Sequence, residues 1–168
     1  MYRREFIPLG YLEPPTLASN KVRLMPDASP YHFAVLHSTM HMAWVRTVTG
    51  RLKSDFQYSV KIVFNNYPWP EPTESQRKAL ESTAQAILDA RSLFPGSSLA
   101  DLYDPRTMPP ELRKAHVAND RAVDAAYGFK GDKSDAGRVA FLFVLYGKVT
   151  SLLPPAKPKR TRREKAEA

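Results

Sequence analysis

The chain of 168 residues has the length of one domain, or of one domain with a small appendage. Hydrophobic residues make up 43% of it and aromatic residues 11%, which is the composition of a globular protein with a sizeable core. No apolar run reaches the roughly 18 residues of a membrane helix, and the N-terminus lacks the apolar stretch of a signal peptide. Cysteine is absent, which excludes disulfides and thiolate metal sites. We therefore expect a soluble, cytoplasmic protein with no membrane partner.

The net charge of +8 is distributed unevenly along the chain. Residues 157–168 hold six Lys and Arg against two Glu, a net of +4, in a string rich in Pro and Lys. Residues 1–61 hold another net +4, whereas residues 62–156 hold eleven residues of each sign. Half of the excess is thus in a predicted disordered tail, which can bind nucleic acid nonspecifically or simply keep the chain soluble. A basic surface on the folded part is expected in the N-terminal third.

The first part of the chain is predicted to combine short strands with one helix. In chain order we expect strands at residues 4–9 and 21–25, a helix at 29–48, a polar basic segment at 51–58 and a strand at 59–64. The helix begins at Ser29 and Pro30, a suitable N-cap and first-turn proline, and ends before Gly50. The last strand is expected to end before Pro68 and Pro70, because proline cannot donate to a strand ladder.

The second part is predicted to be helical almost throughout. We expect helices at residues 73–93, 109–128 and 134–153, with a short turn at 98–103 between the first two. Thr73 and Gln76 have the spacing of a capping box, and Gly128 is a suitable helix stop. The last helix is apolar on most of its circumference, so we expect it to pack in the middle of the protein or to require a partner. The predicted fold class is α+β, predominantly helical, with a small strand-containing N-terminal part before a helical C-terminal part.

The segment that follows the last predicted strand contains Asn65, Asn66, Tyr67, Pro68 and Trp69. It partly resembles the Asn-Pro-Pro-Tyr loop of amino-methyltransferases, in which an Asn side chain and a proline carbonyl hold the amine of the target base. Here no Pro-Pro follows the Asn. We therefore interpret the segment as the end of a strand and not as a catalytic loop.

Four blocks of sequence, in this order, are similar to the C-terminal end of MmeI-type restriction-modification proteins: residues 38–51, 65–71, 102–112 and 120–128. The resemblance covers nearly all of residues 5–153. In that family one long polypeptide carries a nuclease, a helical connector, an adenine N6-methyltransferase that uses S-adenosylmethionine, a target recognition domain and a helical C-terminal domain. The resemblance implies three parts here: the end of a target recognition domain at 1–70, a helical C-terminal domain at 71–155, and a disordered basic tail at 156–168.

The catalytic motifs of that family are not found in this chain. Its glycines form no G-x-G motif for the cofactor, and no Pro-Pro-Tyr-type loop is present for a flipped base. Asp101, Asp104 and Glu111 flank prolines and are interpreted as caps and turns, not as a nuclease metal cluster. We therefore expect no catalytic residue and no metal or cofactor here, with S-adenosylmethionine bound by the missing methyltransferase domain. The expected partners are double-stranded DNA and the remaining domains of the enzyme.

If residues 1–70 belong to a recognition domain, some side chains must reach base edges. Lys53 and Asp55 lie in the polar basic segment and would point the same way in an extended chain. Lys donates to guanine O6 and N7, and Asp accepts from cytosine N4, so together they could discriminate one G·C pair. The alternative is that they only solvate a loop.

Arg46, Arg51 and Lys61 are candidate phosphate contacts, because they lie in the basic third and would position the domain without specifying sequence. His37 and His41 have an i, i+4 spacing that could hold a metal, but no further ligands accompany them, so a partly buried helix surface or a phosphate contact is favoured.

Two tryptophans, Trp44 and Trp69, are predicted to be core residues and not platforms for base stacking. For the whole chain the alternative functions are a helical protein-interaction domain that holds such an enzyme together, and a free-standing regulatory protein with a nonspecific basic tail.

Overall fold

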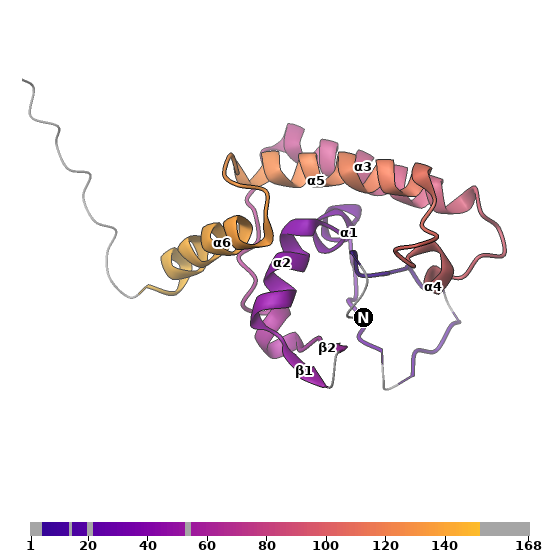
Figure 1. The fold of residues 1–168 in the computed structure, drawn as a ribbon, viewed down its shortest axis with the longest axis horizontal. Coiled ribbons are helices and arrows are strands. Elements are labelled where there is room, and N and C mark those ends of the chain that lie inside the picture. Colours follow the sequence, from indigo (N-terminus) through magenta and orange to yellow (C-terminus); the bar gives the residue numbers. More distant parts are fainter. Residues whose placement is uncertain (1–4, 14, 20–21, 53–54, 152–168) are drawn as a thin grey trace, which may run out of the picture.

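The computed structural model describes residues 5–13, 15–19, 22–52 and 55–151 (Figure 1). Its elements are α1 (Pro30–Leu36), α2 (Thr39–Val48), β1 (Gly50–Leu52), β2 (Asp55–Gln57), a π-helix (Val60–Phe64), α3 (Glu74–Ser92), α4 (Leu99–Leu102), α5 (Pro110–Tyr127) and α6 (Asp135–Thr150). Within the described residues β1 and β2 are the only strands, and they form one antiparallel pair. The predicted class, α+β with helices predominating, is confirmed.

Helices α3 and α5 lie side by side and run antiparallel across one side of the molecule (Figure 1). Thr73 and Gln76 form the predicted capping box at the start of α3, and the Gln76 amide donates to the Ala125 carbonyl near the end of α5 over 2.9 Å. Gly128 ends α5 with φ of 64°, a conformation that glycine adopts without strain. The contact between the two helices is apolar and buried, with these residues on its inner side: Leu80, Ala84, Ile87, Leu112 and Val123.

Helix α6 begins where predicted, with the Ser134 hydroxyl accepting from the Gly137 amide, but it does not lie in the middle of the protein. It packs on α2 at one end of the molecule, and only one apolar side chain of α6, Leu142, is fully buried. Phe143 and Val144 remain 45% and 59% exposed. Of the two alternatives, a central position does not hold among the described residues, which cover only one face of α6, and the need for a partner remains a prediction. No helix in the described part of the chain is long and apolar enough to span a membrane.

The single helix expected at residues 29–48 is divided into α1 and α2. His37 ends the first helix, and Ser38 adopts an extended backbone with ψ of 155°. The Ser38 hydroxyl donates to the Val35 carbonyl over 2.7 Å and accepts from the His41 amide over 3.1 Å. Both helix ends are thus satisfied by one side chain, which stabilises a break that helical periodicity alone does not indicate.

Neither of the first two predicted strands is present in the described residues. Residues 5–9 and 22–25 are irregular, while residues 4 and 21 lie outside the described part. Phe6 and Ile7 are nonetheless buried, and the Phe6 ring stacks on His116 of α5 at 4.0 Å. The apolar residues of the first segment are therefore buried against helices, whereas Val22 and Leu24 of the second are 49% and 63% exposed. Neither segment pairs with a strand in the described residues.

The strand predicted at residues 59–64 is a single turn of π-helix. The Asn65 amide donates to the Val60 carbonyl over 2.9 Å, which is an i to i−5 hydrogen bond, and the Ser59 hydroxyl caps the turn. Val63 is fully buried, whereas Ile62 is 52% exposed. Tertiary contacts override the β propensity of this run, because the Trp44 indole donates to the Val63 carbonyl over 3.1 Å and holds it against α2.

Candidate nucleic-acid interface

The β1–β2 hairpin projects from the C-terminal end of α2, on the side of the molecule away from the α3–α5 pair (Figure 1). Gly50 pairs with Gln57, and Leu52 pairs with Asp55. The Thr49 hydroxyl, at the end of α2, donates to the Gln57 carbonyl and closes the base of the hairpin. Phe56 is the buried anchor of β2, with 7% of its surface exposed. The polar basic segment of the sequence is therefore a short, projecting structure with an ordered base.

Of the two predicted base-reading residues, the structure describes only Asp55, which is the first residue of β2. The backbone of Asp55 pairs with Leu52, whereas Lys53 lies outside the described residues. The prediction that Lys53 and Asp55 contact base edges therefore remains a prediction. In the sequence, Lys53 follows β1 and Asp55 begins β2, two positions further on.

The three predicted phosphate contacts have different surroundings. Arg51 is exposed in β1, with its guanidinium carbon 5.1 Å from the centre of the Phe56 ring. Lys61 is exposed on the π-helix that follows the hairpin. Arg46, in contrast, donates to both oxygens of Asp135 over 2.8 and 3.1 Å and to the Glu5 carbonyl over 3.4 Å. Arg51 and Lys61 thus flank the hairpin, while Arg46 joins α2 to α6.

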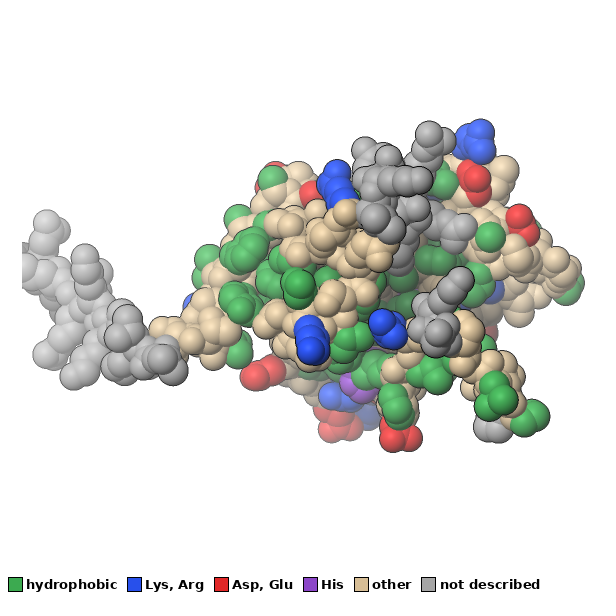
Figure 2. Space-filling model, turned by 90° about the horizontal axis from the view of Figure 1, so that it is seen from below, with side chains coloured by type: hydrophobic (Ala, Val, Ile, Leu, Met, Phe, Trp, Pro, Cys, Tyr) green, Lys and Arg blue, Asp and Glu red, His purple; other side chains and the backbone are tan. Residues whose placement is uncertain are grey.

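Figure 2 shows the face toward which the hairpin points. Its Lys and Arg side chains are separated by hydrophobic ones and do not form a continuous stripe. The sequence reasoning missed several exposed apolar residues in the N-terminal part, among them Leu24, Val60 and Ile62, which are 63%, 38% and 52% exposed. This face therefore offers isolated cations and small apolar contacts, which are suited to individual phosphates and base methyl groups.

The Asn- and Pro-containing segment has a structural role. The Asn66 amide donates to the carbonyls of Lys61 and Ile62 over 2.8 and 3.1 Å, and so caps the π-helix. The Pro68 carbonyl accepts from the Tyr127 hydroxyl over 2.8 Å, and that of Pro70 accepts from the hydroxyl of Tyr31. These groups are occupied within the protein, which supports the interpretation that this is not a loop for a target amine.

The two tryptophans differ in exposure. Trp44 is buried, with 2% of its surface exposed, as predicted for a core residue. Trp69 is only partly buried and lines an open hollow of about 310 Å³ together with Met25, Tyr31, His32 and Phe64.

His37 and His41 do not face a common ligand, because the break at Ser38 places them in different surroundings. His37 Nε2 lies 2.8 Å from an Arg91 nitrogen, and His41 Nε2 lies 3.1 Å from the Tyr58 hydroxyl. Burial lowers the pKa of His41 to about 3 and that of His37 well below its usual value, the latter assisted by the charge of Arg91. Both imidazoles are therefore neutral at physiological pH and act as parts of the core. Among the described residues no cluster of three metal-ligating side chains is found.

A rigid helical body that carries a small projecting hairpin, with Arg51 and Lys61 beside it, has the architecture of a recognition module built on a scaffold. The comparison with protein families agrees. Residues 2–71 match the MmeI target recognition domain, and residues 72–154 match the MmeI C-terminal domain. The chain belongs to the MmeI family, as the sequence resemblance implied.

Two similar proteins support this assignment. DNA methyltransferase A of Bacillus subtilis (strain 168) is 40% identical over 147 residues, which are 88% of this chain and 17% of the relative. The Type IIL restriction-modification enzyme MmeI, solved in complex with DNA, is 51% identical and superimposes with a TM-score of 0.87 over 89% of this chain and 20% of its own. The chain thus spans a fifth or less of the length of either relative.

Proposed function

We propose that this chain is the DNA sequence-recognition and structural module of a restriction-modification DNA methyltransferase, and that it is not catalytic by itself. Methyl transfer to adenine N6, with S-adenosylmethionine as cofactor, belongs in this proposal to domains outside the chain. The match to a target recognition domain supports it, as do a relative named as a DNA methyltransferase and another solved with DNA. The partners are double-stranded DNA and the remaining domains of the enzyme, in the cytoplasm.

The observation that carries the proposal is the projecting hairpin with exposed cations on both of its flanks. Arg51 lies in its first strand, and Lys61 follows its second strand. A two-stranded ribbon fits the major groove of B-DNA, and cations beside it would neutralise phosphates of the groove walls. We assign to Lys53 and Asp55 direct contacts with a G·C pair, worth about 1–3 kcal/mol of discrimination against a wrong base.

Among the phosphate contacts, Arg51 and Lys61 are assigned the larger role. Arg46 would have to exchange its ion pair with Asp135 for a phosphate, so the net gain from contacting DNA is smaller. Its second function is to hold α2 against α6, whether or not DNA is bound.

A second function, as a helical protein-interaction domain, is favoured by α6. Phe143, Val144 and Val149 are 45%, 59% and 79% exposed, and the segment 62–156 carries no net charge. A neutral, apolar surface suits packing against protein better than wrapping a phosphate backbone. The two functions divide the chain: the hairpin region contacts DNA, and the helical part contacts the rest of the enzyme.

The test is binding of the chain to random duplex DNA over a range of salt concentrations, with a parallel sample that ends at Pro155. Binding that survives truncation and weakens with salt is expected, since a folded surface would then contact phosphates. The double variant Arg51→Ala/Lys61→Ala should lower the salt slope by about 2. If all binding disappears with the tail, the hairpin region does not contact DNA in this chain and the first function is rejected for it.

A further inference from the structure

The segment from the second strand of the hairpin to the π-helix, residues 57–63, is attached to one helix by side-chain hydrogen bonds. His41, Trp44 and Thr49 lie on α2 or at its C-terminal end. Their partners are, in the same order, the Tyr58 hydroxyl at 3.1 Å, the Val63 carbonyl at 3.1 Å and the Gln57 carbonyl. All three partners follow the hairpin tip within a short stretch of chain. These hydrogen bonds therefore orient the hairpin through the chain segment that follows its tip.

The contact between His41 and Tyr58 differs from the other two, because both partners are side chains. His41 is fully buried and its imidazole is neutral, since burial holds its pKa at about 3. Its second ring nitrogen, Nδ1, has no hydrogen-bond partner in the described structure. The Tyr58 hydroxyl is thus the only side-chain group in the described residues that satisfies this ring. Loss of this hydrogen bond would leave both ring nitrogens of a buried imidazole unsatisfied. The free-energy cost of that loss holds the His41 and Tyr58 side chains in one relative position.

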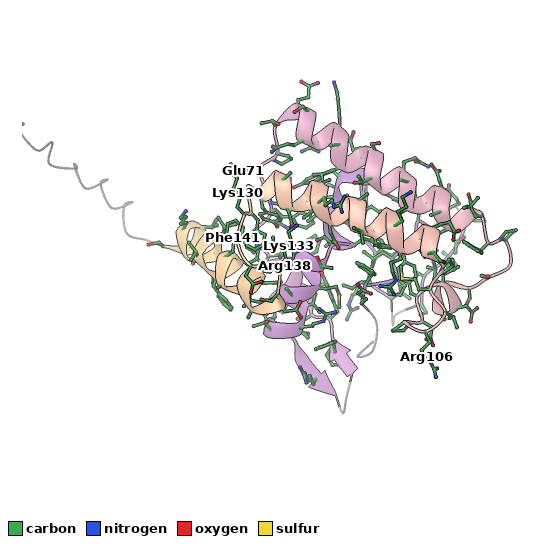
Figure 3. All side chains as sticks on the ribbon, turned by 45° about the horizontal axis from the view of Figure 1, so that its top comes forward. Glu71, Arg106, Lys130, Lys133, Arg138 and Phe141 are labelled. Atoms are coloured by element: carbon green, nitrogen blue, oxygen red, sulfur yellow. The ribbon has the colours of Figure 1, made fainter. Side chains whose placement is uncertain are left out.

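Helix α2 is in turn held by the C-terminal helices. The Thr39 amide, in its first turn, donates to an Asp120 oxygen of α5 over 2.7 Å. The Trp44 ring lies 5.4 Å from Phe143 and 5.9 Å from Tyr146, both on α6. Helix α6 is tied to α5 by a buried ion pair between Arg138, whose position Figure 3 shows, and Asp124. A continuous set of contacts therefore runs from α5 and α6 through α2 to the hairpin.

From this geometry we infer that His41 and Tyr58 are positioning residues that set the orientation of the recognition hairpin relative to the C-terminal helices. They act on DNA only through the hairpin, so they control discrimination between base pairs and not the overall attraction to the phosphate backbone. The inference rests on the proposed function, in which the hairpin tip contacts bases. It assigns to the C-terminal helices a part in sequence selection, as the support from which α2 aligns the hairpin.

The test uses Tyr58→Phe, which removes one hydroxyl and leaves the ring in place. The matched control is Tyr11→Phe, which removes a hydroxyl from a 42% exposed tyrosine that stacks on Phe33. Each chain is incubated with a random duplex library, the bound fraction is sequenced, and affinities are measured for the preferred duplex and its single-base variants. Tyr58→Phe is expected to lower the ratio of these affinities by about three- to tenfold, the equivalent of one hydrogen bond, while Tyr11→Phe leaves it unchanged.

Two further variants separate the inference from simple destabilisation and from the proposed function. His41→Gln keeps a polar group near the position of Nε2 and should retain most of the discrimination, whereas His41→Leu should lose it. A uniform loss of affinity for all duplexes in Tyr58→Phe overturns the inference, because a positioning residue alters the ratio.

An unchanged ratio in Tyr58→Phe, together with an altered base preference in the double variant Lys53→Ala/Asp55→Ala, overturns the inference and leaves the proposed function standing. If the unmodified chain shows no preference for any sequence, both fail.

Discussion

The α3–α5 pair and the hairpin region, residues 49–64, are stabilised in different ways. The pair buries aliphatic side chains along two long helices, as at Leu80 and Leu112, which are fully buried. The hairpin region has two strands of three residues each and is attached to α2 by single hydrogen bonds. The two regions therefore contribute differently to stability and to binding. Substitutions in the pair affect folding, whereas exposed positions of the hairpin region can change with little loss of stability and are free to determine what the protein binds.

The largest effect is expected from breaking the buried ion pair of the helical part. Arg138→Met leaves the Asp124 carboxylate buried without its partner, and should lower the free energy of unfolding by about 3–5 kcal/mol. Urea denaturation followed by circular dichroism measures this. The double variant Arg138→Met/Asp124→Leu should recover much of the loss, because no charge then remains buried. A single variant as stable as the original chain would contradict the assignment of this pair as a link between α5 and α6.

A cavity in the helical pair should have the next largest effect. Leu112→Ala removes buried methyl groups from the α3–α5 contact and should cost about 2–5 kcal/mol of stability. The matched substitution in the hairpin region is Ile62→Ala, at a side chain that is 52% exposed, with an expected change within about 0.5 kcal/mol. Thermal unfolding of both variants compares the two regions directly. Equal losses would show that the hairpin region contributes as much to folding as the pair.

A pH dependence is expected where α5 meets α2, the helix that supports the hairpin region. Burial raises the pKa of Asp120, which accepts from Thr39 of α2, to about 6, despite the opposing charge of Arg138. The folded state binds this proton more tightly than the unfolded state, so the contribution to stability is complete below about pH 4 and is lost as the pH rises through 6. Asp120→Asn should therefore be stabilising at pH 8 relative to the original chain, on the order of 1–3 kcal/mol, and nearly neutral at pH 4.

The effect of Asp120→Asn is the difference in free energy of unfolding between the variant and the original chain at the same pH. The opposite pH dependence of other buried groups cancels in this difference. The pKa values of His37 and His116 are lowered by burial, so these groups destabilise the fold as the pH falls. If Asp120→Asn changes the stability by the same amount at pH 4 and pH 8, the pKa of Asp120 is the same in the folded and unfolded states and the prediction is wrong.

The smallest effect on stability is expected on the hairpin face, where binding changes instead. Lys61→Ala should leave the free energy of unfolding within about 0.5 kcal/mol of the original and reduce the salt slope of DNA binding by about 1. Lys78→Ala is the control, because this lysine pairs with Glu74 on an exposed face of α3. A change of slope in the control, or none at Lys61, would place the phosphate contacts on the helical part.

The helical part was predictable because its signals are local. A capping box at Thr73 and Gln76, apolar residues at helical spacing and a glycine stop at Gly128 define α3 and α5 almost to the residue. The N-terminal part was predicted poorly. Its apolar runs at residues 5–9 and 59–64 have strand propensity, yet the first packs on α5 as irregular chain and the second forms a π-helix. Strand formation requires a partner strand, and no local pattern shows that one is missing.

For the candidate site, the location of the basic, polar segment could be predicted from the sequence, but its geometry could not. Nothing in residues 49–58 has the Asn-Gly or Asp-Gly signal of a two-residue hairpin loop, so the reversal between Leu52 and Asp55 was missed. The roles of His41 and Tyr58 were missed as well. They are 17 positions apart, and a histidine on a helix carries no indication of which distant hydroxyl it meets.

By itself the sequence determined the helical C-terminal half, the place of the basic charge and the relationship to MmeI. Helix caps, apolar periodicity and motifs each depend on residues that are close together in the chain. Only the tertiary structure decided that α1 and α2 are separate helices, that residues 60–64 form a turn of π-helix and that α2 supports a projecting hairpin. The break between α1 and α2 is stabilised by the Ser38 hydroxyl, which bonds to residues three positions away. The other two features depend on hydrogen bonds between residues far apart in the chain, such as those of Trp44 with Val63 and His41 with Tyr58. Such bonds become favourable only when the fold has excluded water from both partners.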